Sequence, residues 1–293
     1  MWAAGRFDRA AEFVSAARRI GFQRIELNPQ VSKDMLQEIM TLHDSGAVSI
    51  SSVHAPCPTW PGPGPIPELS ALDESVRVAA VGIIKAAIDL ARRLDAHRVV
   101  VHSGRVDVDV RNEETLRRLC EQGEKDSADY RRAMLDLMRE RAEKSPPHLE
   151  ATMRSLQEVQ EYARGSGVRL GLETRYHYYE IPLPEEVQRL LGWLDPAIFG
   201  YWHDVGHANN LEVLGFLSHE EWLSRFGSRL VGIHLHDARR TADHRPVGMG
   251  DIDFEMVRKH VPPGAVRVCE FNSSWPEDEV EAAFNRLKGL GLV

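Results

Sequence analysis

Six short apolar runs in this sequence each end in a side chain that can bind a metal ion. Imidazole and carboxylate groups at such positions suit Zn²⁺, Mn²⁺ or Co²⁺ better than Ca²⁺. Glu173 and Glu270 each follow a run that should be buried, and a buried carboxylate without a partner is costly. A divalent cation would compensate both charges. The six positions are His54, His102, Glu173, Asp204, His234 or His236, and Glu270.

Two short motifs could contribute further ligands. In HDVGH, Asp204 and His207 are spaced i, i+3 where a strand passes into a turn, so both can face one ion or one hydrogen-bond network. In HLHD, His234 and His236 share one face of a strand, so at least one should point inward. Each residue alone also has a structural interpretation, because strand-end histidines are commonly hydrogen-bonded and Asp204 could cap a turn.

Polar residues that follow these strands could bind a substrate. Arg175 follows Glu173 and Arg240 follows HLHD, and a guanidinium can pair with an anionic group or with hydroxyls. Both could equally be surface arginines. The segment DHRPVGMGDIDF (243–254) is rich in turn residues, and its plain interpretation is a flexible loop.

These residues need a scaffold that brings distant positions together. Runs rich in β-branched and aliphatic residues predict strands, and helical periodicity between them predicts a β-α alternation. The later strands recur at roughly the 30-residue spacing of a βαβ unit, which favours an α/β fold of the (β/α)8 TIM-barrel type. The strands of such a barrel share one mouth at their carboxyl ends. The predicted strands are 24–27, 48–54, 98–102, 168–173, 198–204, 229–237 and 266–270.

The spacing also predicts departures from a regular barrel within a single domain, 1–293. A Pro- and Gly-rich segment after His54 indicates an ordered loop over the strand ends, which could act as a lid. Helical periodicity over about 105–165 indicates an inserted helical pair after the His102 strand. The first barrel strand looks absent or reduced, so we expect residues 1–5 to form at most a stub strand. A loop, a helix or a neighbouring subunit should cover the opening.

Composition limits the classes of function. The chain is 43% hydrophobic and 27% charged, as in soluble globular proteins, and its formal charge of -8 makes nucleic acid an unlikely partner. Three distant cysteines without a CxxC pair suit a reducing compartment. The N-terminus lacks a signal-peptide core and no run of 18 apolar residues occurs, so we expect a cytoplasmic protein without a membrane partner. It could form homo-oligomers.

The strand-end residues resemble those of the xylose isomerase-like barrel superfamily. This superfamily includes sugar isomerases, ketose 3-epimerases, inosose dehydratases and type IV apurinic endonucleases. In its epimerase branch, Glu, Asp, His and Glu from successive strands hold a metal. The branch's H-x-x-acid-x-x-R pattern matches His234, Asp237 and Arg240, which favours His234 over His236 as a ligand. The resemblance therefore implies a divalent metal (Mn²⁺, Zn²⁺ or Co²⁺) bound by Glu173, Asp204, His234 and Glu270.

This resemblance implies a metal-dependent isomerase or epimerase of a sugar, sugar phosphate or cyclitol. Glu173 and Glu270 would be the acid/base pair of an enediolate-type proton transfer, and a dehydratase would share its opening step. Arg175, His207 and Arg240 would bind substrate oxygens.

Two alternatives remain open from the sequence. Type IV apurinic endonucleases use additional histidines to build a three-metal site for phosphodiester hydrolysis. A barrel that binds a sugar or a metal without turnover is the other alternative. Residues that could supply additional metal or substrate contacts are His54, His102, His207, His236 and His244.

Overall fold

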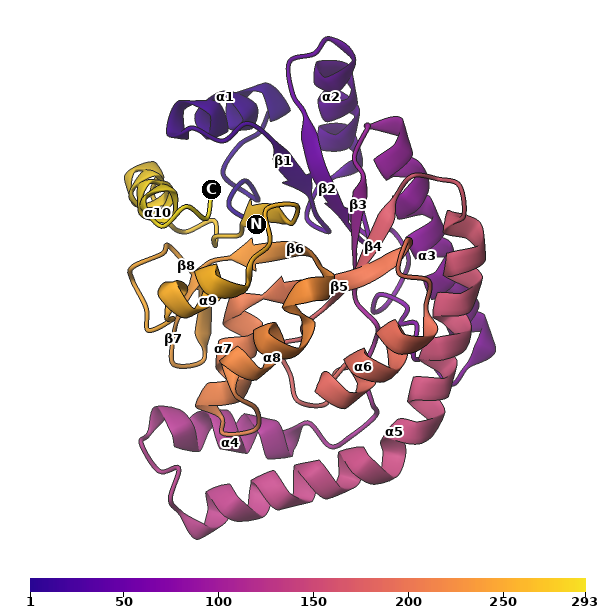
Figure 1. Cartoon of the computed structure of the whole chain (residues 1–293), viewed down its shortest axis with the longest axis vertical. Helices are drawn as coiled ribbons and strands as arrows, with labels where there is room; N and C mark the ends of the chain where they lie inside the picture. Colours follow the sequence, from indigo (N-terminus) through magenta and orange to yellow (C-terminus); the bar gives the residue numbers. More distant parts are fainter.

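A parallel sheet curls into an incomplete barrel with helices around it (Figure 1). The structure is a computed structural model that describes residues 1–293. Neighbouring strands pair in parallel in the order β1-β2-β3-β4-β5-β6-β9. All the predicted strands are confirmed, with ends that differ by a few residues. The strands are β1 (Ile25–Leu27), β2 (Ile50–His54), β3 (Arg98–Val101), β4 (Arg169–Glu173), β5 (Phe199–Asp204), β6 (Leu230–Leu235) and β9 (Val266–Cys269).

Amphipathic helices cover the outer face of this sheet, and the main hydrophobic core lies between the two layers. Asp73 caps α3 by accepting hydrogen bonds from the backbone N–H groups of Ser75 and Val76. None of the helices combines the length and the apolar composition that a membrane crossing requires. The helices are α1 (Ala10–Ile20), α2 (Lys33–Asp44), α3 (Glu74–Arg93), α4 (Arg111–Glu121), α5 (Ala128–Ala163), α6 (Pro184–Trp193), α7 (Val205–Val213), α8 (His219–Phe226), α9 (Phe254–His260) and α10 (Glu277–Gly289), with a 3-10 turn at Gly227–Arg229.

The predicted helical insertion after β3 is confirmed. Helix α4 packs against the first half of α5 around a small core of its own, which is separate from the barrel core. The second half of α5 returns to the barrel, where Ser155 and Glu158 bind the buried Arg77 of α3. Helix α5 therefore serves both the insertion and the barrel wall.

A small apolar cluster fills the middle of the barrel interior. It consists of Val100, Trp202 and Val231, and we call it the apolar plug. A Cβ atom added at Gly171 or Gly232 would lie less than 3 Å from the Trp202 ring, so these glycines make room for the indole. The plug separates the carboxyl ends of the strands from their amino ends.

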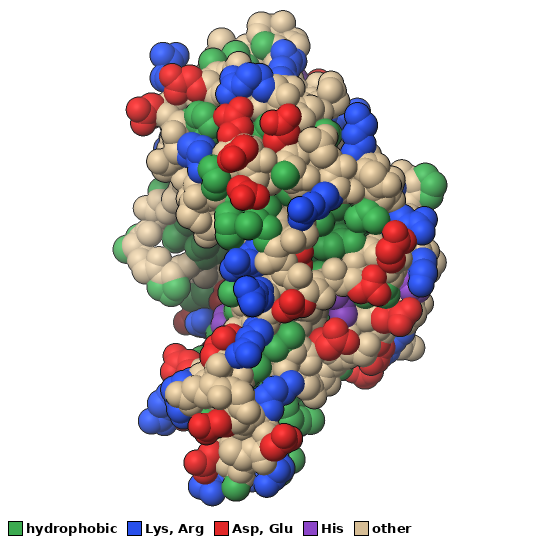
Figure 2. Space-filling view, turned by 90° about the vertical axis from the view of Figure 1, so that its left-hand side faces the viewer, with side chains coloured by type: hydrophobic (Ala, Val, Ile, Leu, Met, Phe, Trp, Pro, Cys, Tyr) green, Lys and Arg blue, Asp and Glu red, His purple; other side chains and the backbone are tan.

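The barrel wall is open between β9 and β1, which do not pair. Residues 1–5 form turns instead of a strand, as expected from the sequence, and this loop covers part of the opening. The indole N–H of the buried Trp2 donates to the backbone oxygen of Trp275 (2.9 Å). A cavity of about 890 Å³ remains between the edges of β1 and β9. Figure 2 faces this side and shows hydrophobic side chains exposed between charged ones.

A two-stranded antiparallel hairpin, β7 (Asp237–Arg239) and β8 (Ala242–Arg245), follows β6. The interpretation of 243–254 as a flexible loop is therefore wrong at its start, which forms β8. The buried carboxylate of Asp237 accepts hydrogen bonds from the backbone N–H groups of Gly248, Gly250 and Ile252 (2.8, 2.9 and 3.2 Å). This one side chain orders the rest of the segment, because a buried carboxylate needs donors and the glycine backbone approaches it closely.

The Pro- and Gly-rich segment after His54 forms neither helix nor strand, as expected. Its two ends are anchored. The Thr59 N–H donates to the backbone oxygen of Val31 (2.8 Å), and the Ser70 hydroxyl donates to that of Arg105 (2.8 Å).

Candidate metal centre

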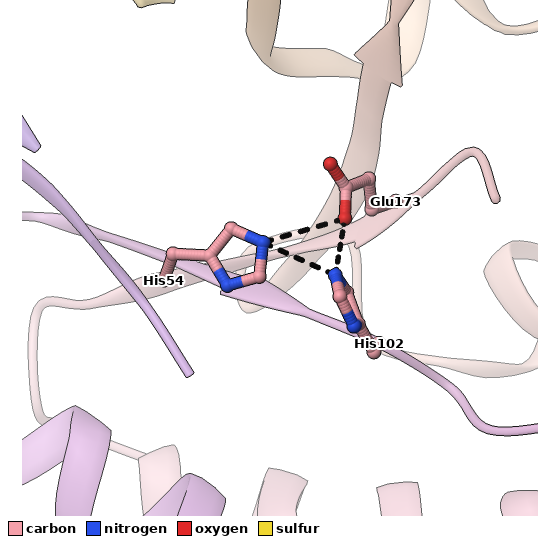
Figure 3. A group of neighbouring side chains, drawn as sticks. All are labelled: His54, His102 and Glu173. Carbon is pink, nitrogen blue, oxygen red and sulfur yellow. Dashed lines mark hydrogen bonds and ion pairs between the residues drawn. The ribbon is translucent and has the colours of Figure 1, made fainter. Parts of the chain in front are cut away.

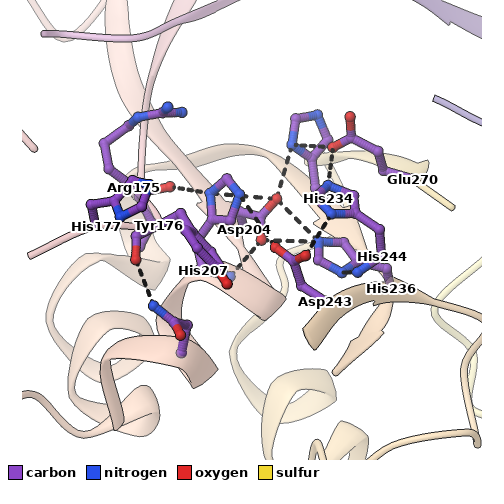
Figure 4. A network of polar contacts seen from close by, with 12 residues as sticks. Arg175, Tyr176, His177, Asp204, His207, His234, His236, Asp243, His244 and Glu270 are labelled. Carbon is purple, nitrogen blue, oxygen red and sulfur yellow. Dashed lines mark hydrogen bonds and ion pairs between the residues drawn. The ribbon is translucent and has the colours of Figure 1, made fainter. Parts of the chain in front are cut away.

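The predicted strand-end residues converge at the carboxyl ends of the strands (Figures 3 and 4). Their convergence follows from the parallel sheet, which aligns all these ends at one mouth. Glu173, Asp204, His234 and His236 are at most 1% exposed. The metal-competent residues form three adjoining groups, each with its ligand atoms within 4.8 Å of one another. The groups are Glu173, Asp204 and His234; His54, His102 and Glu173; and Asp204, His207 and His244.

The central group surrounds one nitrogen of His234 with carboxylates (Figure 4). Nδ1 lies 2.8 Å from Glu173 Oε1 and 3.4 Å from Asp204 Oδ2. It also lies 3.2 Å from Oε2 of Glu270, which follows β9. Three buried or half-buried carboxylates and an imidazole make a donor set that a divalent transition metal accepts. A protonated His234 places a positive charge among these oxygens, which is where a cation would be needed, so the residues present fit a metal.

Glu26 of β1 also belongs to this centre, although the sequence analysis missed it. Its Oε1 lies 3.0 Å from Nε2 of His234, and its Oε2 accepts from the Ser52 hydroxyl. A carboxylate bound to the far nitrogen of a metal-binding histidine fixes its tautomer and leaves the other nitrogen for the ion. The available signal was an acidic residue between Ile25 and Leu27 in a buried strand, where alternation turns it toward the barrel interior.

The charges in the central group stabilise one another. Burial opposes ionisation of Glu270, but His234 and His244 outweigh it and lower the pKa of Glu270 to about 2. Burial also opposes ionisation of Glu173 and Asp204, yet neighbouring histidines hold the pKa of both well below the usual range. Burial disfavours the charged form of His234, but Glu270 and the other carboxylates raise its pKa well above the ordinary value.

The second group extends the centre across β2, β3 and β4 (Figure 3). His102 Nε2 lies 2.7 Å from Glu173 Oε2 and 3.1 Å from Nε2 of His54. His54 Nε2 lies 3.6 Å from the same carboxylate oxygen, while its Nδ1 is 3.1 Å from the backbone oxygen of Ala55. Glu173 thus faces His234 with one oxygen and the two histidines with the other, as a bridging ligand would.

The third group lies where α7 and the β7–β8 hairpin meet the mouth. Asp204 caps α7 by accepting the backbone N–H of His207 (2.8 Å). The Nδ1 atom of His207 is 2.9 Å from the backbone oxygen of Thr174, which leaves Nε2 without a hydrogen bond, 4.0 Å from Oδ2 of Asp243. His244 Nδ1 lies 2.9 Å from Oδ1 of Asp243, a second acidic residue that the sequence analysis missed. Asp243 could not be assigned from the sequence because it depends on the hairpin.

His236 and His234 play different roles, although both point inward. The Nε2 of His236 lies 3.0 Å from Asp204 Oδ1, and its Nδ1 accepts the backbone N–H of His244 (2.9 Å). A backbone N–H therefore occupies one nitrogen of His236, and its other nitrogen faces only Asp204. His234 instead presents Nδ1 to three carboxylates, which favours His234 as the ligand and His236 as a support for Asp204.

The two predicted substrate-binding arginines lie in different surroundings. Arg175 donates to Glu173 (2.8 Å) and to Glu180 (2.8 Å) and is half-buried at the mouth. The guanidinium of Arg240 donates to the backbone oxygen of Glu121 in α4, and its side chain is 54% exposed. Arg240 therefore lies outside the three ligand groups, and its role in substrate binding stays a prediction.

Helix α4 fixes the loop that follows Glu173. The buried Glu113 carboxylate lies 2.8 Å from Nδ1 of His177, and it accepts the backbone N–H of Tyr178 (3.0 Å). The Arg117 guanidinium lies over the Tyr176 ring, 4.2 Å from its centroid. The insertion thereby shapes one side of the mouth.

Solved structures of sugar epimerases share this architecture. A D-tagatose 3-epimerase-like protein matches with a TM-score of 0.66 and 21% identity, over 92% of this chain and 88% of that one. The 3-keto-D-glucoside 4-epimerase of E. coli matches with a TM-score of 0.68 and 13% identity, over 98% of this chain and 96% of that one. The D-psicose 3-epimerase of Clostridium cellulolyticum matches with a TM-score of 0.65 and 15% identity, over 99% of this chain and 94% of that one. At these identities the likeness shows the fold alone.

A curated relative and a family model complete the comparison. An uncharacterized protein of Methanocaldococcus jannaschii is 26% identical over 228 residues, which cover 76% of this chain. The match covers 64% of that relative, so this chain spans less than two thirds of its length. The family model described as xylose isomerase-like TIM barrel matches residues 14–290. With nearly the whole chain matched, and with the strand-end residues gathered at one mouth, this chain belongs to the xylose isomerase-like TIM barrel family.

Proposed function

We propose that this chain is a metal-dependent isomerase or epimerase of a sugar, a sugar phosphate or a cyclitol. The observation that carries the proposal is the pair Glu173 and Glu270, whose carboxylates approach the same nitrogen of His234 from β4 and from the end of β9 (2.8 and 3.2 Å). Two carboxylates at one position can act on the two faces of a bound substrate.

The proposed reaction moves one proton at carbon. One carboxylate removes the proton next to the substrate carbonyl, and the released electron pair forms the carbon–carbon double bond of an enediolate. The other carboxylate returns a proton to the opposite face in an epimerisation, or to the neighbouring carbon in an isomerisation. The lowered pKa values of Glu173 and Glu270 keep both groups ionised in the resting protein, so either can accept the substrate proton, and the proton that the other returns must first reach it from water.

The remaining residues have binding and positioning roles in this proposal. A divalent cation held by Glu173, Asp204, His234 and Glu270 would supply positive charge for the two enediolate oxygens. The free Nε2 of His207 and the Arg175 guanidinium border the same mouth and can bind substrate hydroxyls. Glu26 and His236 keep His234 and Asp204 in place. The solved structures of similar fold are those of sugar epimerases, which supports a sugar-type substrate.

Two measurements test the proposal. Purified protein should contain a divalent transition metal that chelation removes, and only background metal after reconstitution would contradict the metal site. The metal-loaded protein should catalyse exchange of deuterium from heavy water into carbon of at least one member of a panel of ketoses, aldoses and cyclitols. The Glu270→Gln variant should lose this exchange but keep part of its metal. Ligand binding without any exchange would instead indicate a barrel that binds without turnover.

One observation favours a second candidate, a phosphodiester hydrolase of the type IV apurinic endonuclease kind. His54 and His102 share Glu173 with the central group, and His207 and His244 share Asp204 with it. Three adjoining groups suit a multi-metal hydrolytic site. The formal charge of -8 counts against a DNA substrate. Two or three metals per chain, with nicking of abasic DNA that is lost in His102→Ala or His244→Ala, would favour the hydrolase over the isomerase.

A further inference from the structure

The cavity between β1 and β9 reaches the metal centre. Its lining includes Glu26 and Glu270, whose carboxylates lie 3.0 and 3.2 Å from the two ring nitrogens of His234. Val266 and Val268 also line it, and they lie on the same inner face of β9 as Glu270 because side chains alternate along a strand. The cavity therefore begins at the carboxylates of the central group and continues along the inside of the open barrel wall.

The outer part of the cavity is apolar. It passes between the two strand edges to the helix layer, where side chains of α1, α2 and α10 line it. The rings of Phe22 and Phe284 pack edge to face there, with their centroids 4.7 Å apart. Of the 36 residues that line the whole cavity, 21 are hydrophobic. A ligand in the outer part would contact mainly rings and alkyl groups.

The polar side chains that border the cavity away from the metal centre are already used within the protein. The Ser51 hydroxyl donates to the backbone oxygen of Ile25 (3.1 Å). The Asn28 side-chain oxygen accepts the backbone N–H of Gln30 (3.1 Å), and the Gln23 amide donates to a backbone oxygen of its own turn (3.3 Å). A hydroxyl-rich group placed here would give up its hydrogen bonds to water without equivalent partners, which costs affinity.

We propose that this cavity binds an apolar group of the substrate, which is then a sugar or cyclitol that carries an alkyl or aryl substituent. The hydroxyl-rich part binds at the metal centre, and the apolar part enters the cavity between β1 and β9. This inference rests on the proposed function, since it takes the metal centre as the place where the substrate reacts. The cavity volume of about 890 Å³ lies within the range of small-molecule pockets, roughly 300 to 1,000 Å³, whose walls are likewise mostly apolar.

The test compares matched phenyl and methyl β-D-glycosides of glucose, galactose and xylose. Glycosides have no free carbonyl group, so binding to the metal-loaded full-length protein is measured without turnover, by titration calorimetry. At least one phenyl glycoside should bind about tenfold or more tightly than its methyl partner, because burial of the ring removes apolar surface from water.

Variants that narrow the cavity locate the phenyl group. Val268→Phe should weaken binding of the phenyl glycoside about tenfold and leave the methyl glycoside affinity and the metal content unchanged. Cys269→Phe narrows the cavity from the outer face of β9 and is the second variant if Val268→Phe does not fold. Val78→Phe is the control, since it adds the same ring at a position of α3 that is 50% exposed, and it should keep the full preference.

Three results would overturn the inference. The first is equal affinity for the phenyl and methyl glycosides in every pair, and the second is a phenyl preference that both cavity variants retain. The third is a dimer of the unaltered protein that both cavity variants dissociate, seen by sedimentation velocity, because a second chain would then occupy the opening. A phenyl preference that Val268→Phe removes, without deuterium exchange into any sugar, would support the apolar site and contradict the proposed function.

Discussion

The two sides of the barrel wall differ in how well they exclude water. Strands β3 to β6 are fully paired, and their interior residues Val100, Trp202 and Asp204 have no exposed surface. On the side where β9 and β1 face each other across the cavity, Val268 and Glu270 are only half-buried. A charge or a methyl group on the closed side has only protein around it, whereas water can replace a lost partner on the open side. Comparable residues on the closed and open sides should therefore contribute unequally to metal affinity and to the free energy of unfolding.

The largest expected effect is the loss of Glu173 from the closed side. Glu173→Gln should lower metal affinity by on the order of 1,000-fold, which exceeds the roughly 100-fold that losing an outer support of a metal ligand costs. Glu173 is the residue that two of the ligand groups share, and no water can take its place. Glu270→Gln, on the open side, should lose only part of the metal. Metal content after dialysis against a series of chelator concentrations measures the affinity of both variants.

A surface variant controls for general damage in that experiment. Glu158→Gln alters a carboxylate of α5 that pairs with Arg77 far from the mouth, and its metal content should match that of the unaltered protein. Equal metal loss in Glu173→Gln and Glu270→Gln would show that the two sides do not differ.

Acid should lower the stability of the folded protein through His219, which is buried on the closed side. Burial lowers the pKa of His219 to about 4, and its Nε2 lies 2.9 Å from that of His203 behind β5. The unfolded chain binds a proton there near pH 6.5 while the folded chain does not, so stability falls as the pH decreases from about 6.5 to 4. The shift corresponds to a loss of about 3 kcal/mol. Urea unfolding of metal-free protein across this range measures it.

His219→Gln should reduce the slope of this part of the pH profile, because the variant has no group to protonate at that position, while the buried His102 and His203, whose pKa values burial also lowers, keep the rest of the slope. His97→Gln changes an exposed histidine and should keep the original slope. If His219→Gln keeps the original slope as well, the buried pair is not the source of the acid sensitivity.

A matched pair of valines compares packing on the two sides directly. Val100 belongs to the plug and has no exposed surface, whereas Val268 packs against the same plug at the edge of the cavity. Val100→Ala should lower the free energy of unfolding by about 2 kcal/mol, and Val268→Ala by less than about 1 kcal/mol. Denaturant unfolding at constant pH gives both values. A larger cost at Val268 would mean that the cavity edge is as tightly packed as the closed side.

The smallest effect on the metal should come from Glu26, on the open side. Glu26→Gln should lower metal affinity about tenfold, because glutamine still accepts the His234 proton but lacks the charge. Ser52→Ala removes only the hydroxyl that binds Glu26 and should have a still smaller effect. Competition with a fluorescent chelator resolves differences of this size. Affinity unchanged in Glu26→Gln would show that this carboxylate does not support His234.

The barrel strands could be predicted from the sequence because each is a short apolar run, and all but the first end in or next to a metal-competent residue. The ligand candidates followed, since a parallel sheet brings such ends together whatever lies between them. Glu26 was missed because β1 has three residues and ends in Leu27, so its inward-facing acid is not at the end of the run. Asp243 was missed because its position depends on a hairpin that the buried Asp237 carboxylate organises.

Arg240 is a residue that the sequence analysis assigned to substrate binding but that the structure places outside the ligand groups. Its spacing from His234 fits the motif, yet its backbone has a positive φ of 54° in the hairpin turn, and its side chain reaches α4. Spacing along a strand predicts which face a residue occupies only while the strand continues. Beyond Leu235 the chain leaves the barrel sheet, and that rule no longer applies.

The core of the α4–α5 pair has a consequence for the timing of access to the mouth. This core is small and separate from that of the barrel, so the pair can open locally at a lower free energy than the barrel unfolds. When α4 lifts, Glu113 leaves His177 and Arg117 leaves Tyr176. The rate at which a substrate enters or a product leaves would then follow the opening of a surface helix, and hydrogen exchange of the α4 amides would report the same rate.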